Sequence, residues 1–234
     1  MNGRVHSFQS LGTLDGPGVR FVVFLQGCNL RCGCCHNPDT WSLEGGSEYA
    51  PQEVLGRILR LRSYYKNGGV TVSGGEPLLQ SEFVRELFAL CRQEGLHTCL
   101  DTSGSVLSGA ALCVLDVTDR VLLDIKYTCE EQYRQYVGCS LQAPMQFLRE
   151  LDQRHIPTTL RQVVIPGLTD GEENLLRLKA IAAEHACVDG IELLPFKKIC
   201  RTKYDAMGIP FPFADRPTPD KETMARLNAL LSRP

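Results

Sequence analysis

The sequence predicts an α/β protein whose six strand-helix units form a partial parallel, TIM-like (β/α)6 barrel. Continuous apolar runs such as Phe21-Val22-Val23-Phe24-Leu25 are typical of strands that a parallel sheet buries on both faces. Segments with apolar residues at helical spacing separate these runs, as expected when crossover helices join parallel strands. Polar residues and glycines follow several strands, at the end where barrel enzymes carry their catalytic groups.

The length of 234 residues suits a single domain. We divide it into an N-terminal segment (1–18), a barrel core (19–194) and a C-terminal loop and helix (195–234). Lys and Arg number 25 and Asp and Glu 27, so no net field directs the chain to nucleic acid or to a membrane.

Targeting signals and cysteine usage indicate a compartment. No run of about 18 apolar residues is present, and the N-terminus lacks the apolar core of a signal peptide. The 11 cysteines are an odd number in a chain without an export signal, so we expect reduced thiols rather than a disulfide framework. These observations predict a cytoplasmic protein.

The strands are predicted from apolar runs that polar or glycine-rich residues terminate. A loop at 4–18, whose stretch Asp15-Gly16-Pro17-Gly18 is rich in turn residues, is expected to precede the first strand. Ser73-Gly74-Gly75 ends the second strand and Pro166-Gly167 the fifth. In chain order, the six strands are expected at 19–26, 70–72, 97–100, 121–125, 159–165 and 190–194.

The helices are predicted from apolar residues at helical spacing between these strands. Pro51 suits the first position of a helix because it has no N–H to leave unpaired there. The last helix is amphipathic, and we expect it to pack on the barrel wall. The helices are expected at 51–65, 81–94, 145–154, 172–185 and 221–231.

Three cysteines follow the first strand in a Cys-x3-Cys-x2-Cys pattern, at Cys28, Cys32 and Cys35. Three thiolates on one short loop indicate a metal site. A closed structural zinc site needs four ligands, whereas three thiolates on a cubic iron-sulfur cluster leave one iron open to another ligand. A zinc loop with Cys34 as a further ligand is the alternative interpretation.

The cysteine pattern and its place after the first strand resemble the radical S-adenosylmethionine (radical SAM) superfamily. Gly74-Gly75-Glu76-Pro77 is similar to the Gly-Gly-Glu-Pro motif of that superfamily, although an isolated Gly-Gly is more often a simple tight turn. The resemblance implies one 4Fe-4S cluster and S-adenosylmethionine, whose reductive cleavage yields methionine and a 5'-deoxyadenosyl radical.

Further motifs are similar to the glycyl radical enzyme activases, and most of all to the pyruvate formate-lyase activating type. No cysteine lies between Cys35 and Cys91, which corresponds to the short activases with a single cluster. The similar segments are Asp15-Gly16-Pro17-Gly18-Val19-Arg20-Phe21, Gln26-Gly27-Cys28, Cys35-His36-Asn37-Pro38-Asp39-Thr40-Trp41, Leu100-Asp101-Thr102-Ser103-Gly104 and Leu123-Asp124-Ile125-Lys126.

The resemblance also implies partners. The substrate is expected to be a glycine of pyruvate formate-lyase or of another glycyl radical enzyme, and the electron donor a flavodoxin or a ferredoxin. We expect a monomer. An alternative of a different class is a non-catalytic iron-sulfur module for redox or interaction.

The resemblance implies the site residues one by one. The cluster ligands, which are also the catalytic residues, are Cys28, Cys32 and Cys35. The cofactor site is expected to contain Cys34, Cys35, His36, Gly74, Gly75, Glu76, Asp101, Asp124, Ile125, Lys126, Arg161 and Lys197, the last at a position where a histidine is usual. A monovalent cation, Na or K, is expected at Asp101, Thr102 and Asp124, although strand-end carboxylates also cap turns.

Two further groups of residues have structural or surface interpretations. The seven remaining cysteines show no ligand spacing, and we interpret them as buried thiols. The basic run 197–203 is expected to be a solvated face, with contact to the partner protein as the alternative.

Overall fold

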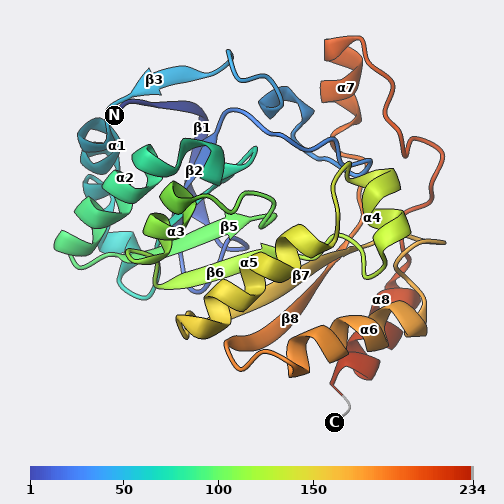
Figure 1. The fold of residues 1–234 in the computed structure, drawn as a ribbon. Coiled ribbons are helices and arrows are strands. Elements are labelled where there is room, and N and C mark those ends of the chain that lie inside the picture. The colour runs from blue at the N-terminus through green and yellow to red at the C-terminus, as the bar shows by residue number, and fades with distance from the viewer. Residues whose placement is uncertain (233–234) are drawn as a thin grey trace. The chain divides into compact units, whose positions relative to one another are not determined.

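The protein, described from a computed structural model over residues 1–232, has an α/β fold built on one open sheet (Figure 1). Its strands follow the order β3-β1-β2-β4-β5-β6-β7-β8. The strands are β1 (Gly3–Gly12), β2 (Arg20–Leu25), β3 (Ser47–Tyr49), β4 (Gly69–Gly74), β5 (His97–Thr102), β6 (Arg120–Asp124), β7 (Thr158–Val164) and β8 (Val188–Pro195).

The predicted fold class is confirmed. The six predicted strands correspond to β2 and β4 to β8; β2, β4 and β5 pair in parallel, as do β7 and β8. The α-helices are α1 (Pro51–Leu59), α2 (Ser81–Gln93), α3 (Gly109–Leu115), α4 (Glu130–Tyr136), α5 (Gln142–Gln153), α6 (Glu172–Ala183), α7 (Arg201–Met207) and α8 (Lys221–Leu231). The short helices α3, α4 and α7 were not predicted.

The N-terminal segment differs from the prediction, because most of the expected loop at 4–18 is a strand. β1 pairs antiparallel with β2 on one side and with the short β3 on the other, so the sheet is mixed at this edge. Register shifts interrupt the pairing of β1 with β2 between Val5 and Ser7 and between Gln9 and Gly12. Such bulges break the two-residue alternation that identifies a strand in a sequence.

The chain divides into two compact units, one of Met1–Asn29 with Thr40–Leu122 and one of Leu30–Asp39 with Leu123–Pro234. In the first unit, α1, α2 and α3 lie side by side on one face of the strands (Figure 1). The apolar stripe of α2, from Phe83 to Cys91, is buried there. The N-terminal amino group pairs with Glu86 of α2 at 2.8 Å.

In the second unit, α6 and α8 pack beside β8. Val164 of β7, Leu175 of α6 and Leu227 of α8 form a buried apolar cluster. α8 covers the residues predicted for the last helix, and its packing on the strands confirms that expectation. The side chain of Asp220 caps its first turn by accepting a hydrogen bond from the Thr223 N–H at 2.7 Å.

A fully buried arginine fixes the turn at residues 15–18 in the first unit. Arg20, which is 0% exposed, donates to Thr71 Oγ1 at 2.5 Å and to the carbonyls of Val70 and Pro17 at 2.7 and 3.0 Å. The Thr71 hydroxyl in turn donates to the Asp15 carbonyl at 2.6 Å. These bonds compensate the desolvation of the guanidinium group, which lowers the pKa of Arg20.

We expect Arg20→Ala to lower the free energy of unfolding by about 3–5 kcal/mol, because it leaves a cavity and buried acceptors without a donor. Denaturant titration measures the change. Arg62→Ala is the matched control: Arg62 pairs with Glu94 at 3.1 Å on the surface, so its loss should cost less than about 1 kcal/mol. Equal effects of the two substitutions would contradict the role of Arg20.

Candidate functional site

The first cysteine of the loop, Cys28, belongs to the first unit and follows the C-terminal end of β2. Backbone hydrogen bonds fix its surroundings: the Gly27 N–H donates to the Thr40 carbonyl at 2.7 Å and the Cys28 N–H to the Trp41 carbonyl at 3.4 Å. On the other side, the Glu76 N–H donates to the Gly27 carbonyl at 2.8 Å. The start of the loop is therefore held by hydrogen bonds between its backbone and the backbone of neighbouring segments.

Gly74 and Gly75 make this close approach possible. A Cβ atom on Gly75 would lie 2.0 Å from the Gly27 oxygen, and one on Gly74 would lie 2.2 Å from the Leu25 nitrogen. Gly74 also has a φ of +114°, a conformation that side chains other than glycine rarely adopt. Both glycines are therefore required by the backbone of β2 and of the cysteine loop.

The rest of the loop belongs to the second unit, where the end of α4 holds it. The Arg31 N–H donates to the Val137 carbonyl at 3.2 Å and the Gly33 N–H to the Tyr136 carbonyl at 2.8 Å. Cys32 and Cys35 are partly exposed, as Cys28 is in the first unit, whereas Cys34 is only 8% exposed. Burial raises the pKa of the Cys34 thiol to about 11.

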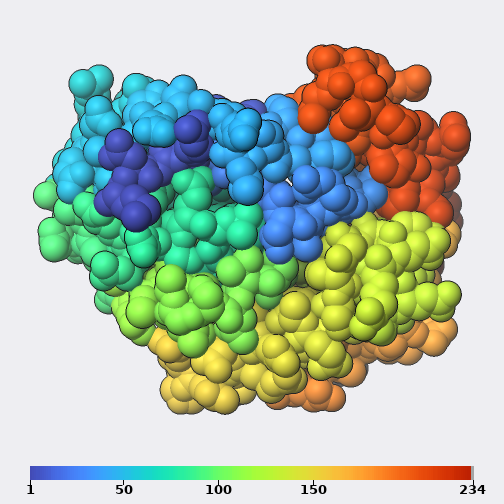
Figure 2. Space-filling view, turned by 45° about the horizontal axis from the view of Figure 1, so that its top comes forward, coloured from blue at the N-terminus to red at the C-terminus, as the bar shows by residue number. Residues whose placement is uncertain are grey.

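α7 provides two further contacts to the loop, from residues that sequence reasoning missed. Lys203 Nζ lies 2.9 Å from Asn37 Oδ1 and 3.0 Å from the Asp39 carboxylate, and the Tyr204 hydroxyl donates to the Cys35 carbonyl at 3.2 Å. The segment around α7 lies at the surface (orange-red in Figure 2), but Lys203 does not follow the prediction of a solvated basic face. These pairs are more than 160 residues apart in sequence and leave no local signal.

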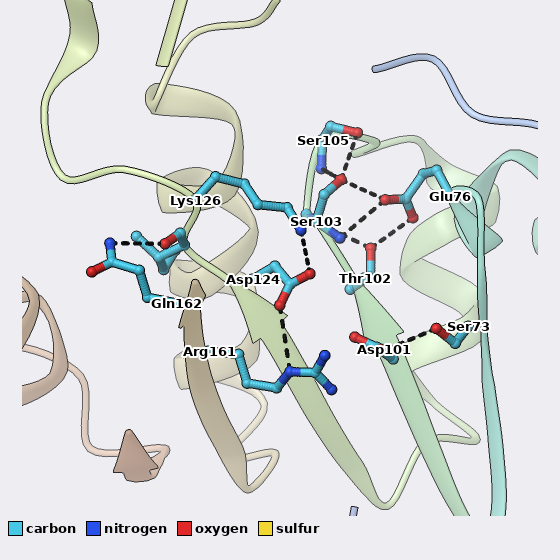
Figure 3. Close-up of polar contacts among 12 residues, drawn as sticks. Ser73, Glu76, Asp101, Thr102, Ser103, Ser105, Asp124, Lys126, Arg161 and Gln162 are labelled. Carbon is cyan, nitrogen blue, oxygen red and sulfur yellow. Dashed lines mark hydrogen bonds and ion pairs between the residues drawn. The ribbon is translucent and has the colours of Figure 1, made fainter. Parts of the chain in front are cut away.

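A charged pair stands at the end of β6. Lys126 Nζ lies 2.5 Å from Asp124 Oδ2, and Arg161 Nε of β7 lies 3.5 Å from Asp124 Oδ1 (Figure 3). Burial opposes ionisation of Asp124, but Lys126 and Arg161 outweigh it and hold the pKa of Asp124 below its usual value. Burial would lower the pKa of Lys126, but the Asp124 carboxylate outweighs burial and raises this pKa well above its usual value.

Buried amides fix the backbone beside this pair. Gln162 Nε2 donates to the Ile125 carbonyl at 3.1 Å, and Gln162 Oε1 accepts from Asn174 Nδ2 at 2.7 Å. Asn174 Oδ1 accepts from the Thr128 hydroxyl at 2.7 Å. This chain fixes the segment that carries Asp124 and Lys126 from both sides.

His36 and Lys197 meet in the second unit. His36 Nε2 lies 2.9 Å from the Lys197 carbonyl, which can only accept, so Nε2 carries the proton. Burial lowers the pKa of His36. The neutral ring therefore presents Nδ1 as an acceptor, while Lys197 contributes its backbone at this contact.

The polar residues at the ends of β4 and β5 form a separate network in the first unit (Figure 3). Asp101 Oδ2 accepts from the Ser73 hydroxyl at 2.7 Å, and Glu76 Oε1 accepts from the Thr102 hydroxyl at 2.6 Å. Burial raises the pKa of Glu76, against the effect of the hydrogen bonds from Ser103 and Thr102. Glu76, at 1% exposure, is the most deeply buried carboxylate of this network.

Residues 1–232 contain no group of three His, Cys, Asp or Glu side chains arranged around one metal ion. The cation site at Asp101, Thr102 and Asp124 stays a prediction. The ligands of a cluster bind separate irons and need not converge on one point. The donor set of Cys28, Cys32 and Cys35, three partly exposed thiols on one loop, fits a three-ligand 4Fe-4S cluster.

Outside the loop, the expectation of buried thiols is wrong for Cys113, which is exposed, while Cys129 and Cys139 are half-buried. The other four are buried, and no disulfide forms within the described residues.

Within residues 1–232, no helix is both long enough and apolar enough to cross a membrane.

The fold and the three-cysteine loop define a class of protein. The family model of the radical SAM superfamily matches residues 22–178, so the chain belongs to the radical SAM superfamily. Members of this superfamily use a 4Fe-4S cluster and S-adenosylmethionine.

Within the superfamily, the similarity extends over nearly the whole chain. The pyruvate formate-lyase 1-activating enzyme of Escherichia coli K12 is 40% identical over 99% of this chain and 96% of its own length. The pyruvate formate-lyase-activating enzyme of Clostridium pasteurianum is 40% identical over 98% of this chain and 97% of its own length. This similarity places the chain in the family of pyruvate formate-lyase activating enzymes.

Solved structures share the fold. A domain of a pyruvate-formate lyase-activating enzyme from Bacteroides vulgatus matches with a TM-score of 0.59 and 23% identity, over 71% of this chain and 94% of that one. Streptococcus suis SuiB bound to its precursor peptide SuiA matches with a TM-score of 0.70 and 15% identity, over 89% of this chain and 44% of that one.

Tyr127, directly after Lys126, has a buried hydroxyl with no hydrogen-bond partner in the described part of the chain. We expect Tyr127→Phe to raise the free energy of unfolding of the metal-free protein by about 1–2 kcal/mol, because it removes an unsatisfied polar group and keeps the ring. Tyr65→Phe is the control with the opposite expected sign, since the Tyr65 hydroxyl donates to the Ser10 carbonyl at 2.7 Å. Denaturant titration measures both changes. A lower free energy of unfolding in Tyr127→Phe would contradict the conclusion that the Tyr127 hydroxyl is unsatisfied.

Proposed function

We propose that this protein is a glycyl radical enzyme activase whose substrate is pyruvate formate-lyase. The observation that carries the proposal is the 40% identity to pyruvate formate-lyase activating enzymes over 99% of the chain. When bound, the cluster and adenosylmethionine supply an electron and a 5'-deoxyadenosyl radical, which takes one hydrogen atom from a glycine Cα and leaves a glycyl radical.

The chain's own residues bind and orient these groups. Cys28, Cys32 and Cys35 ligate the cluster as thiolates. In the second unit, Asp124 and Lys126 offer a carboxylate and an ammonium group, charges that complement a zwitterionic amino acid moiety. Because Lys126 and Arg161 already neutralise Asp124, this charged pair is ordered without a ligand, which lowers the entropic cost of binding.

The remaining partners and the location are part of the same proposal. A flavodoxin or ferredoxin donates the electron, the protein acts as a monomer, and it works in the cytoplasm. The cysteines within residues 1–232 form no disulfide, which is in keeping with a reducing compartment. The near balance of acidic and basic residues supports local recognition of the protein substrate rather than long-range attraction.

Anaerobic reconstitution with iron and sulfide, followed by reduction and addition of adenosylmethionine and pyruvate formate-lyase, tests this function. We expect 5'-deoxyadenosine in the product and the electron paramagnetic resonance doublet of a glycyl radical on the partner. A doublet only with a different glycyl radical enzyme would reassign the substrate. If a protein with an intact cluster does not cleave adenosylmethionine, the alternative of a non-catalytic iron-sulfur module holds instead.

A matched pair of variants tests the ligand assignment. Cys32→Ala should abolish adenosylmethionine cleavage because it removes one of the three ligands, whereas Cys34→Ala should keep a full complement of iron, since Cys34 lies outside the motif spacing and is buried. Iron and sulfide analysis together with the visible spectrum measure both. Loss of the cluster in Cys34→Ala would instead favour a site that uses this thiol.

A further inference from the structure

The carboxylate of Glu76 is saturated by hydrogen bonds from the protein. Its Oε1 accepts from the Thr102 hydroxyl at 2.6 Å and from the Leu78 N–H at 3.1 Å, and its Oε2 accepts from the N–H and hydroxyl of Ser103 at 3.0 and 2.5 Å. A carboxylate has about four positions for accepted hydrogen bonds. With 1% of Glu76 exposed, none of these positions is left for a ligand.

A chain of hydrogen bonds leads from this carboxylate to the cysteine loop. The Ser103 hydroxyl donates to Glu76 Oε2 at 2.5 Å, accepts from the Ser105 N–H at 3.3 Å and lies 2.9 Å from the Ser105 hydroxyl (Figure 3). Ser105 Oγ in turn contacts both ends of the Asn29 side-chain amide, Nδ2 at 3.2 Å and Oδ1 at 3.3 Å. These contacts connect the buried carboxylate to the loop through side chains that are hydrogen-bonded to one another.

Glu76 therefore contacts the loop on both sides of Cys28. Its backbone N–H binds the Gly27 carbonyl at 2.8 Å, and its side chain reaches Asn29 through Ser103 and Ser105. In this chain of contacts Glu76 contributes the carboxylate and Asn29 the side-chain amide of the loop.

We propose that Glu76 is a positioning residue for the cluster ligand Cys28, acting through Gly27 and through the chain Ser103, Ser105 and Asn29, and that its carboxylate does not bind adenosylmethionine. This inference rests on the cluster-binding part of the proposed function. Because hydrogen bonds hold both neighbours of Cys28, its thiolate stays in place when a chelator competes for the iron of the cluster.

A double-mutant cycle on the reconstituted protein tests the chain. Asn29→Ala and Ser105→Ala should each speed the loss of iron to a chelator about two- to tenfold, the range expected for one hydrogen bond. The double variant should lose iron no faster than either single variant, because both substitutions break the same connection. In a Glu76→Gln background, Ser105→Ala should add nothing further.

Ser108→Ala is the matched control. Ser108 lies three residues beyond Ser105 and caps α3 by accepting from the Ala111 N–H at 3.1 Å, so its loss should lower unfolding stability and leave the iron-loss rate unchanged. Multiplicative effects of Asn29→Ala and Ser105→Ala, or no effect of either, would overturn the positioning role.

Affinity for adenosylmethionine, measured by calorimetry, should be unchanged in Ser105→Ala; a loss of affinity there would assign the network to the cofactor instead. A wild-type protein that forms no cluster would refute the proposed function itself.

Discussion

The hydrogen bond from the Glu76 amide to the Gly27 carbonyl, 2.8 Å long, is the contact on which the first part of the cysteine loop depends. The loop is rich in glycine and cysteine and has few large side chains to bury, so its geometry must come from backbone contacts. The glycines of β4 make that contact possible, since a Cβ on Gly75 would overlap the Gly27 oxygen. A motif expected to face the cofactor is thus also a structural support.

In the second unit, other elements hold the second part of the cysteine loop. The end of α4 binds the backbone at Arg31 and Gly33, and α7 binds Cys35 and Asp39. Aromatic rings pack beside these contacts: Tyr136 lies 5.5 Å from Phe213, whose ring would touch a Cβ on Gly33 at 2.7 Å. A side chain at position 33 would therefore meet the buried ring of Phe213.

Local patterns made the chemistry predictable from the sequence. The spacing of Cys28, Cys32 and Cys35 lies within one short segment, and apolar runs identified the parallel strands. β1 was missed because its bulges break the alternation of buried and exposed residues. The pair Lys203 and Asp39 was missed because two charges 164 residues apart leave no pattern in a single sequence.

The same limit applies within the candidate site. Residue types placed Asp124 and Lys126 at a strand end, but not their pairing with each other and with Arg161. Sequence spacing also carries no information on burial, so the enclosure of Cys34 and of the Glu76 carboxylate emerged only from the fold. The role of each side chain toward the cofactor stays a prediction that ligand-bound measurements can test.

The contacts of α7 with the loop have a consequence for how the protein is made. Lys203 and Tyr204 follow the cysteine motif by more than 160 residues, so the second half of the loop cannot reach its final conformation until almost the whole chain has left the ribosome.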